Sequence, residues 1–198
     1  MKTTTIDLIR HGEPEGGRAF RGHNIDDPLS EKGWLQMRDA IGEHCPWSHI
    51  VSSPMQRCSA FANEVASKHG LTVSIDDRLK EVGFGEWEGK MPEQLQQQRL
   101  DEYTAFYADP VNNRPAGAED LEIFISRVVD AWNDISQRYA GQHVLVVAHA
   151  GVMRAIIAHV LLSEPAGLYR IKVENAGISR IRISGRGAML ELHNHSFK

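Results

Sequence analysis

One short run of residues limits the fold of this chain more than any other. Residues 144–149 read VLVVAH, so five apolar side chains follow one another before a histidine. A strand without a polar face has to be covered on both sides, as in largely parallel sheets that carry helices on each face. The run therefore predicts a central strand of an α/β fold.

Other segments supply the layers around this strand. Strand patterns occur at 3–10, 49–53, 72–76, 178–184 and 188–193, and helical patterns at 30–44, 53–70, 119–139 and after Gly151. This alternation predicts a three-layer α/β/α sandwich with a mostly parallel central sheet. Gly185 and Gly187, between the last two strands, predict an edge hairpin.

The length favours a single domain, residues 1–198, because two compact domains would be unusually small. Residues 84–118 interrupt the alternation of strands and helices with glycine-rich and glutamine-rich stretches. We expect them to form a small flap or lid within that domain.

The composition excludes several classes of partner. With 22 basic and 26 acidic residues the net charge is −4, so nothing predicts a general attraction to nucleic acid or to an anionic membrane. No apolar run approaches the roughly 20 residues that span a bilayer, and no signal-peptide pattern is found. Cys45 and Cys58 are too few for a disulfide framework. We expect a cytoplasmic protein that binds a small metabolite at a local anion site, and a homodimer stays open.

The clearest chemical pattern lies where two strands end. LIRHG (8–12) ends the first strand and VVAHAG (146–151) ends the apolar one, so that each delivers a histidine, His11 or His149. Ligands of open α/β sheets bind at the carboxyl ends of the strands. We therefore expect His11 and His149 to face one another there.

Two arginines belong to the same edge. Ser53 and Pro54 predict the N-cap and first residue of a helix that stops at Gly70, which places Arg57 in its first turn. A cation there opposes the helix dipole unless an anion binds beside it. With Arg10 at the end of the first strand, the set suits a tetrahedral dianion.

Each residue taken singly has a plainer interpretation. His149 alone is more often a satisfied polar residue, and Arg57 alone a surface charge, so the convergence on one sheet edge carries the hypothesis. Metal binding is another interpretation of the 10 histidines, but only His193 and His195 have close ligand spacing. We expect neither a metal nor a cofactor.

Four motifs stand in order along the chain: LIRHGE (8–13), SSPMQR (52–57), EVGFGEWEG (81–89) and AHAGVMR (148–154). Together they resemble the histidine phosphatase superfamily, in its phosphoglycerate mutase-like branch. The resemblance implies phosphoryl transfer through a phosphohistidine without a metal.

The resemblance also implies a role for individual residues. His11 would be the nucleophile, and Glu81 would protonate the leaving group and later activate water. Glu86 and Glu88 stay rivals for that acid role. The remaining catalytic residues would be Arg10, Arg57 and His149. The substrate-binding residues would be Arg10, Arg21, Gly22, Arg57, His149 and Ala150.

Two features favour a phosphatase over a mutase. The stretch Glu15-Gly16-Gly17 stands where mutases usually have Trp-Asn, and the chain is shorter, with less material for a lid that excludes water. A phosphoglycerate mutase-type phosphotransferase, a broad-specificity sugar phosphatase and a non-catalytic phospholigand-binding module stay as alternatives.

The stretch RHGEPEGG (10–17), followed by FRGHNIDDPLSEKGWLQM (20–37), is similar to bacterial α-ribazole phosphatases, which remove the 5′-phosphate of α-ribazole phosphate during cobalamin nucleotide loop assembly. This similarity implies that Arg21 lines the phosphate side of the pocket and that Arg18 is exposed. The leaving group would contact loops 13–28 and 84–118. Four aromatic residues of the second loop could stack on it, but helical spacing more often means core: Phe84, Trp87, Tyr103 and Phe106.

Overall fold

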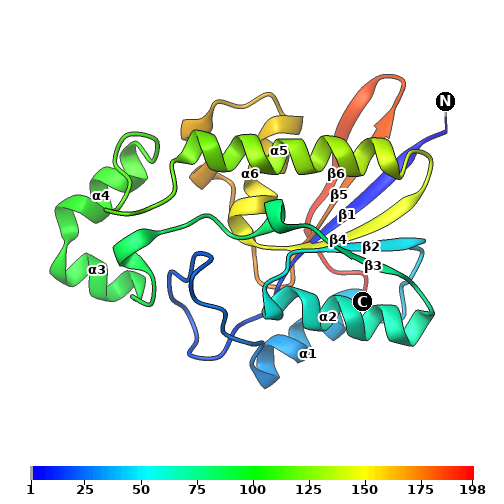
Figure 1. The fold of residues 1–198 in the computed structure, drawn as a ribbon, viewed down its shortest axis with the longest axis horizontal. Coiled ribbons are helices and arrows are strands. Elements are labelled where there is room, and N and C mark those ends of the chain that lie inside the picture. The colour runs from blue at the N-terminus through cyan, green and yellow to red at the C-terminus, as the bar shows by residue number, and fades with distance from the viewer. Residues whose placement is uncertain (1) are drawn as a thin grey trace.

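The computed structural model describes residues 2–198 and contains one mixed sheet (Figure 1). The strand order is β3–β2–β4–β1–β5–β6. Neighbouring strands are parallel from β3 to β1, whereas β5 pairs antiparallel with β1 and with β6. The mostly parallel sheet and the edge hairpin are therefore confirmed. The strands are β1 (Thr4–Arg10), β2 (His49–Ser52), β3 (Val73–Ile75), β4 (His143–Ala148), β5 (Ile178–Ser184) and β6 (Gly187–His195).

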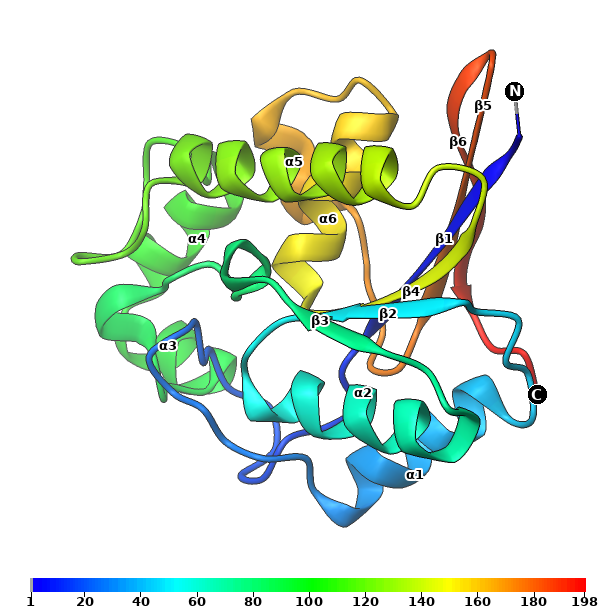
Figure 2. The same ribbon diagram turned by 45° about the vertical axis from the view of Figure 1, so that its right-hand side comes forward.

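Helices cover both faces of the sheet, α1 and α2 on one side and α5 and α6 on the other (Figure 2), which confirms the three layers. Within residues 2–198, no helix combines the length and the apolar character needed to cross a bilayer. The α-helices are α1 (Glu31–Ile41), α2 (Gln56–His69), α3 (Pro92–Gln98), α4 (Leu100–Ala108), α5 (Leu121–Arg138) and α6 (Ala150–Val160). Short 3₁₀ helices are η1 (Asp77–Leu79), η2 (Gly85–Trp87) and η3 (Pro165–Arg170).

The central position of β4 explains its unbroken apolar sequence. Val144, Val146 and Ala148 pack with side chains of α5 and α6. Leu145 and Val147 point the other way and pack with side chains of α1 and α2. All five are fully buried because successive strand residues face opposite layers.

The beginning of α2 differs from the prediction. The N-cap is Met55 and the helix starts at Gln56, so the prediction of Ser53 as N-cap and Pro54 as first helical residue is wrong. The Ser53 hydroxyl instead accepts the N–H of Met55 (3.3 Å) and lies 2.7 Å from Nε2 of His149. The hydroxyl expected to cap the helix therefore also contacts an imidazole of the sheet edge.

Other helix ends are closer to expectation. Gly70 follows α2 in the left-handed region, at a φ of 67°, as predicted. Gly42 ends α1 at Ile41, short of the predicted end. Asp120 caps α5 by accepting backbone N–H groups of the first turn, so that helix starts at Leu121.

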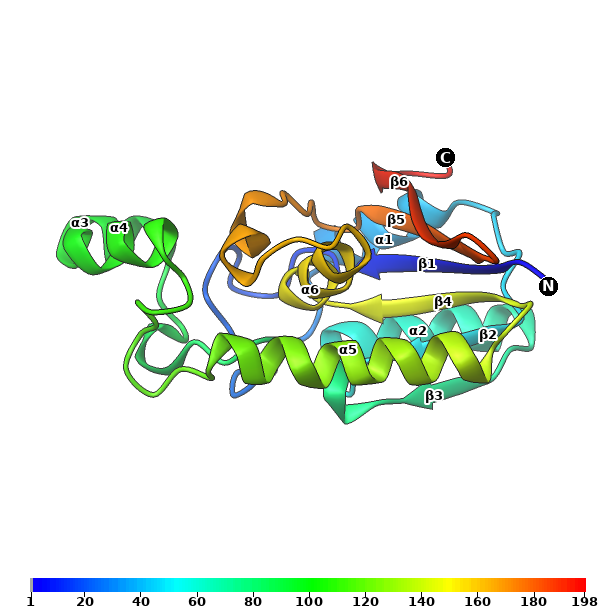
Figure 3. The ribbon, with the colours of Figure 1, turned by 90° about the horizontal axis from the view of Figure 1, so that it is seen from above.

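Residues 84–118 contain η2, α3 and α4. Figure 3 shows α3 and α4 at one end of the molecule, beyond the carboxyl ends of β1 and β4. Trp87 and Phe106 are buried with their ring centroids 5.1 Å apart, and Tyr103 stacks on Trp87. The core interpretation therefore holds for these aromatic residues.

The loop that follows β1 is pressed against the first turn of α1. A Cβ at Gly12 would overlap the carbonyl oxygen of Gly33, and a Cβ at Gly33 would overlap that of Glu13. The N-cap Ser30 donates its hydroxyl to the Glu13 carbonyl oxygen (2.8 Å) and accepts the N–H of Gly33 (3.0 Å). The start of α1 therefore holds the loop that carries His11.

Gly33→Ala should lower the free energy of unfolding by about 1–3 kcal/mol, because the new methyl group has no room without a backbone shift. Urea unfolding measures this change. The matched control is Leu35→Ala on the exposed side of α1, which should cost less than about 0.5 kcal/mol. Equal effects of the two substitutions would contradict the close approach.

Candidate active site

Two imidazoles meet at the carboxyl ends of β1 and β4, at the sheet edge that the sequence predicted. Arg10, the last residue of β1, pairs with Ala148, the last residue of β4, and His11 and His149 follow them. The ring centroids of the two histidines lie 5.2 Å apart at an interplanar angle of 65°. Both side chains are buried.

The surroundings of His11 select one protonation state. Its Nδ1 lies 2.7 Å from the carbonyl oxygen of Gly12, which can only accept, so Nδ1 carries the proton and Nε2 keeps a free lone pair. Burial, with the charges of Arg10 and Arg57, holds the pKa of His11 well below its ordinary value. The imidazole is therefore neutral at neutral pH and nucleophilic at Nε2.

His149 lies behind His11. It is fully buried and does not line the cleft described below. Burial, followed by the charge of Arg57, holds its pKa well below the ordinary value as well. Its Nε2 lies 2.7 Å from the Ser53 hydroxyl.

Arg10 and Arg57 have guanidinium groups whose hydrogen-bonding capacity is only partly used. Their Nη groups donate to backbone carbonyl oxygens at 2.7 to 3.0 Å, which orients both planes. The Nε of each is buried and has no hydrogen-bond partner within the described residues. Burial lowers the pKa of Arg10 to about 10, so it stays charged at neutral pH. Charged donors with unused capacity suit a phosphate group.

The loop that precedes α1 supplies Arg21 and Gly22. The Arg21 guanidinium is largely buried, and its Nε donates to the carboxylate of Asp27 (2.8 Å). Gly22 has a φ of 58°, and its carbonyl oxygen accepts Nη2 of Arg57 (3.0 Å). A Cβ at Gly22 would overlap the carboxylate of Glu88, so the backbone and Glu88 approach closely here.

Of the three acids in the EVGFGEWEG motif, Glu81 reaches the site. Its carboxylate accepts the N–H of Gly151 (3.2 Å), and a Cβ at Gly151 would overlap that carboxylate. Glu86 pairs with Arg99 at the surface, and Glu88 accepts a backbone N–H at 3.0 Å. The structure therefore separates Glu81 from its two rivals.

The groups around His11 line one cleft of about 670 Å³. Six cationic side chains and three carboxylates line it, so the cleft is positive although the chain carries a net charge of −4. Ala150, at the start of α6, also lines it. Arg18 is exposed, as expected, and pairs with Glu93 while lining the same cleft. The cations are Arg10, Arg18, Arg21, Arg57, Arg154 and Lys172; the carboxylates are Glu13, Glu81 and Glu174.

Sequence reasoning missed three residues of the cleft wall. Arg154 stacks over the ring of Tyr169, with 5.4 Å from its guanidinium carbon to the ring centroid, and Tyr107 lies beside Tyr169. Arg154 stands one helical turn after Ala150, a spacing that could have indicated a shared face. Tyr107 lies in residues 84–118, which were expected to contact the leaving group, although the sequence did not single it out. No local pattern could have brought Tyr169 to the cleft.

Comparison with known proteins identifies the family. The family model described as the histidine phosphatase superfamily (branch 1) matches residues 6–196. The chain belongs to the histidine phosphatase superfamily.

Individual relatives of this histidine phosphatase are phosphatases as well. It is 30% identical over 197 residues to the adenosylcobalamin/alpha-ribazole phosphatase of Salmonella typhimurium, covering 94% of each chain. It is 28% identical to phosphoserine phosphatase 1 of Hydrogenobacter thermophilus, covering 90% of this chain and 86% of that one. The solved structure of the alpha-ribazole phosphatase from Shigella flexneri matches with a TM-score of 0.83 at 27% identity, covering 96% of both chains. The family predicted from the motifs is confirmed, and the chain is a phosphatase.

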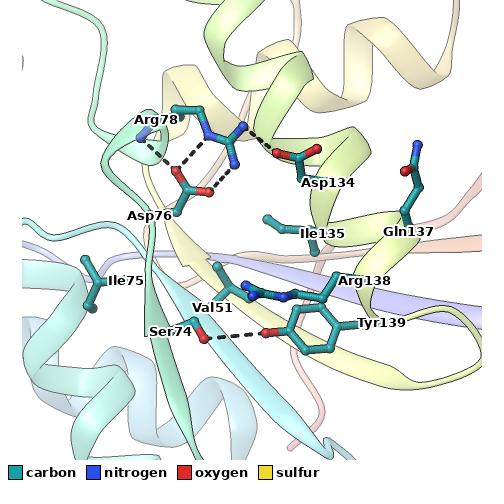
Figure 4. Close-up of a pocket in the computed structure, with 10 residues that line it drawn as sticks. All are labelled: Val51, Ser74, Ile75, Asp76, Arg78, Asp134, Ile135, Gln137, Arg138 and Tyr139. Atoms are coloured by element: carbon teal, nitrogen blue, oxygen red, sulfur yellow. Dashed lines mark hydrogen bonds and ion pairs between the residues drawn. The ribbon is translucent and has the colours of Figure 1, made fainter.

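A second cavity, of about 560 Å³, lies between β3 and α5 of this histidine phosphatase (Figure 4). Its Arg78 pairs with the carboxylates of both Asp76 and Asp134 at 2.7 Å, and Ser74 lies 3.5 Å from the hydroxyl of Tyr139. Arg78 is already neutralised by two carboxylates, and the other cation of the lining, Arg138, is exposed, so this cavity lacks the buried charged donors of the His11 cleft.

The lowered pKa of His11 predicts a pH-dependent stability. Below the ordinary histidine pKa of about 6.5, the unfolded chain binds this proton and the folded chain does not. Stability should therefore fall as the pH drops below that value, by up to about 1.4 kcal/mol per pH unit for this one group. His11→Asn should reduce the slope by that amount, measured by urea unfolding between about pH 7.5 and about pH 5. An unchanged slope would contradict a neutral, buried imidazole.

Proposed function

We propose that this histidine phosphatase hydrolyses phosphate monoesters in two steps through His11. Nε2 of His11 attacks phosphorus, and the new P–N bond forms as the P–O bond to the leaving alcohol breaks. The observation that carries the proposal is the neutral His11 tautomer, with its free Nε2, in a cleft lined by two buried guanidinium groups. Arg10 and Arg57 stabilise the charge on the phosphoryl oxygens during transfer.

Glu81 is the proposed proton carrier. Its carboxylic acid gives a proton to the leaving alkoxide, and the resulting carboxylate takes a proton from the water that attacks the phosphohistidine. The second step releases inorganic phosphate and restores Nε2. The shared cleft of Glu81 and His11 supports this role, as do the other contacts of Glu86 and Glu88.

The other predicted site residues keep proposed supporting roles. Gly22 orients Arg57 through its carbonyl oxygen, and Arg21 adds positive charge near the phosphate. Ala150 contributes the start of α6, whose dipole favours an anion. His149, buried against His11, supports the phosphate pocket from behind.

The proposed substrate is α-ribazole 5′-phosphate, in cobalamin nucleotide loop assembly. Two relatives are named for alpha-ribazole phosphatase activity, and they match nearly the whole chain. The cleft also offers surfaces for a flat aromatic leaving group, because aromatic side chains from separate segments line it. They are Phe20, Phe84, Tyr107 and Tyr169.

Phosphoserine is a second candidate substrate. Arg154 lines the cleft and has no carboxylate partner within the described residues, so it could bind a substrate carboxylate. A relative named as a phosphoserine phosphatase agrees with this chemistry. The mutase alternative has no comparable support, since the relatives described above are phosphatases.

Four expectations from the sequence remain predictions. They are the cytoplasmic location, the homodimer, the single domain and the role of residues 84–118 as a lid. Phe84, Pro92 and Tyr107 of that segment line the cleft, which supports the lid.

The test is release of inorganic phosphate, in the presence of a chelator, from α-ribazole 5′-phosphate, phosphoserine, 3-phosphoglycerate and a sugar phosphate. We expect the highest kcat/KM for α-ribazole 5′-phosphate, and no turnover by His11→Ala with any substrate. A preference for phosphoserine would indicate that Arg154 binds the carboxylate of the substrate. Isomerisation of 3-phosphoglycerate without free phosphate would restore the mutase.

Glu81→Gln should reduce kcat/KM for phenyl phosphate far more than for 4-nitrophenyl phosphate, because kcat/KM reports the first step and 4-nitrophenolate needs little protonation to leave. The loss on phenyl phosphate should be about 10²- to 10⁴-fold. Gly151→Ala should act in the same direction, since its methyl group would overlap the Glu81 carboxylate, and it would also crowd Cγ1 of Val82 at 3.2 Å. Equal losses on both esters would remove Glu81 from the acid role.

A further inference from the structure

A compact polar network holds the short segment that carries Glu81. It joins residues 78–83 to Arg127 on α5 and to Glu119 just before that helix. We infer that Arg127 and Glu119 are positioning residues that place the Glu81 carboxyl over the leaving group. This inference rests on the proposed acid role of Glu81.

Arg127 uses its whole donor capacity in this network. Its Nη1 donates to the carbonyl oxygens of Arg78 (2.6 Å) and Lys80 (2.9 Å). Its Nη2 donates to the carbonyl oxygen of Glu81 (3.3 Å) and to the carboxylate of Glu119 (2.9 Å), which Nε also contacts (2.7 Å). A guanidinium has five N–H donors, so all are satisfied and the side chain has one defined place.

Glu119 completes the network from the other side. Its carboxylate accepts both Nε and Nη2 of Arg127 and also the N–H of Gly83 (3.0 Å). Burial would raise the pKa of Glu119, but the hydrogen bonds from Arg127 and Gly83 outweigh it and hold the pKa below the ordinary value. The ion pair is therefore present at neutral pH, and with side chains only 21% and 15% exposed it is little weakened by solvent.

Two further donors hold the same stretch of backbone. His23 Nδ1 lies 3.1 Å from the carbonyl oxygen of Glu81, so that nitrogen carries the donated proton. Arg114 donates to the carbonyl oxygen of Gly83 (2.9 Å), and a Cβ at Gly83 would crowd the ring of His23. The peptide groups on each side of Glu81 are therefore bound from three directions.

The Glu81 side chain itself has little that fixes it apart from this backbone. Its carboxylate accepts the N–H of the next residue, Val82 (3.0 Å), and that of Gly151 (3.2 Å). Both contacts depend on where the backbone of Glu81 stands, and misplacement by about 1 Å can cost 10²-fold in rate. Arg127 makes no hydrogen bond or ion pair with His11, Arg10 or Arg57 within the described residues. A positioning role thus predicts a defect confined to the step that Glu81 serves.

The experiment compares phenyl phosphate with 4-nitrophenyl phosphate for Arg127→Gln. We expect kcat/KM, which reports the step that releases the leaving group, to fall at least about tenfold more for phenyl phosphate than for 4-nitrophenyl phosphate, as a protonation defect requires. The inhibition constant of inorganic phosphate should change less than about threefold, because the phosphate pocket is not part of the network. Glu119→Gln, which keeps the shape but removes the charge, should give a smaller loss of the same kind.

A matched control lies two turns further along α5. Asp134→Asn breaks the ion pair between Arg78 and α5, so it loosens the same loop without touching residues 80–83. It should lower kcat/KM for both esters equally, if at all. Combining Arg127→Gln with Glu81→Gln should be no worse than Glu81→Gln alone, because the positioned group is already removed.

The outcomes separate the two levels of the argument. If Glu81→Gln distinguishes the esters and neither network variant does, the positioning role is wrong and the acid role stands. If Glu81→Gln fails to distinguish them, both are wrong. If Arg127→Gln does not fold, the ester ratio of Glu119→Gln decides.

Discussion

The proposed chemistry of this protein depends on a neutral imidazole held beside two guanidinium groups. The hydrogen bond from Nδ1 of His11 to the carbonyl oxygen of Gly12 sets the tautomer, and burial beside Arg10 and Arg57 keeps the ring unprotonated. The same guanidinium groups that help to depress the pKa of His11, the proposed nucleophile, are those that can bind the phosphate. The same cluster of side chains therefore keeps His11 neutral and can bind the phosphate group. Both effects depend on the burial of the cluster.

The fold holds the residues of this cluster in place. The parallel strands β1 and β4 end side by side, so the residues directly after each strand meet at one edge of the sheet. The close contact of Gly12 with Gly33 holds the loop that carries His11 against α1, and Gly151 allows Glu81 to reach the start of α6. The sheet and the helices therefore both place groups of the candidate site, and the carboxyl edge of the sheet keeps them together.

Much of this arrangement could be predicted, and the failures have physical causes. The apolar run of β4 and the alternating hairpin strands depend on local periodicity, which is legible in a sequence. Ser53 looked like an N-cap by residue type, but the helix starts at Gln56 and the hydroxyl lies beside His149 instead. Glu119 falls inside the helix predicted over 119–139, but α5 starts at Leu121 and the Glu119 carboxylate pairs with Arg127. In both cases a tertiary partner outweighed a local preference.

The sequence by itself determined the layered fold, the two strand ends that carry His11 and His149, and the family. These follow from side-chain periodicity and from residues adjacent in the chain. Only the tertiary structure decided which acid enters the cleft and what holds it there. Glu81 differs from Glu86 and Glu88 through its contact with Gly151, and Arg127 reaches its carbonyl oxygen from a distant helix. Contacts between residues far apart in the chain depend on how the layers pack, and no local sequence pattern shows which of these residues will meet.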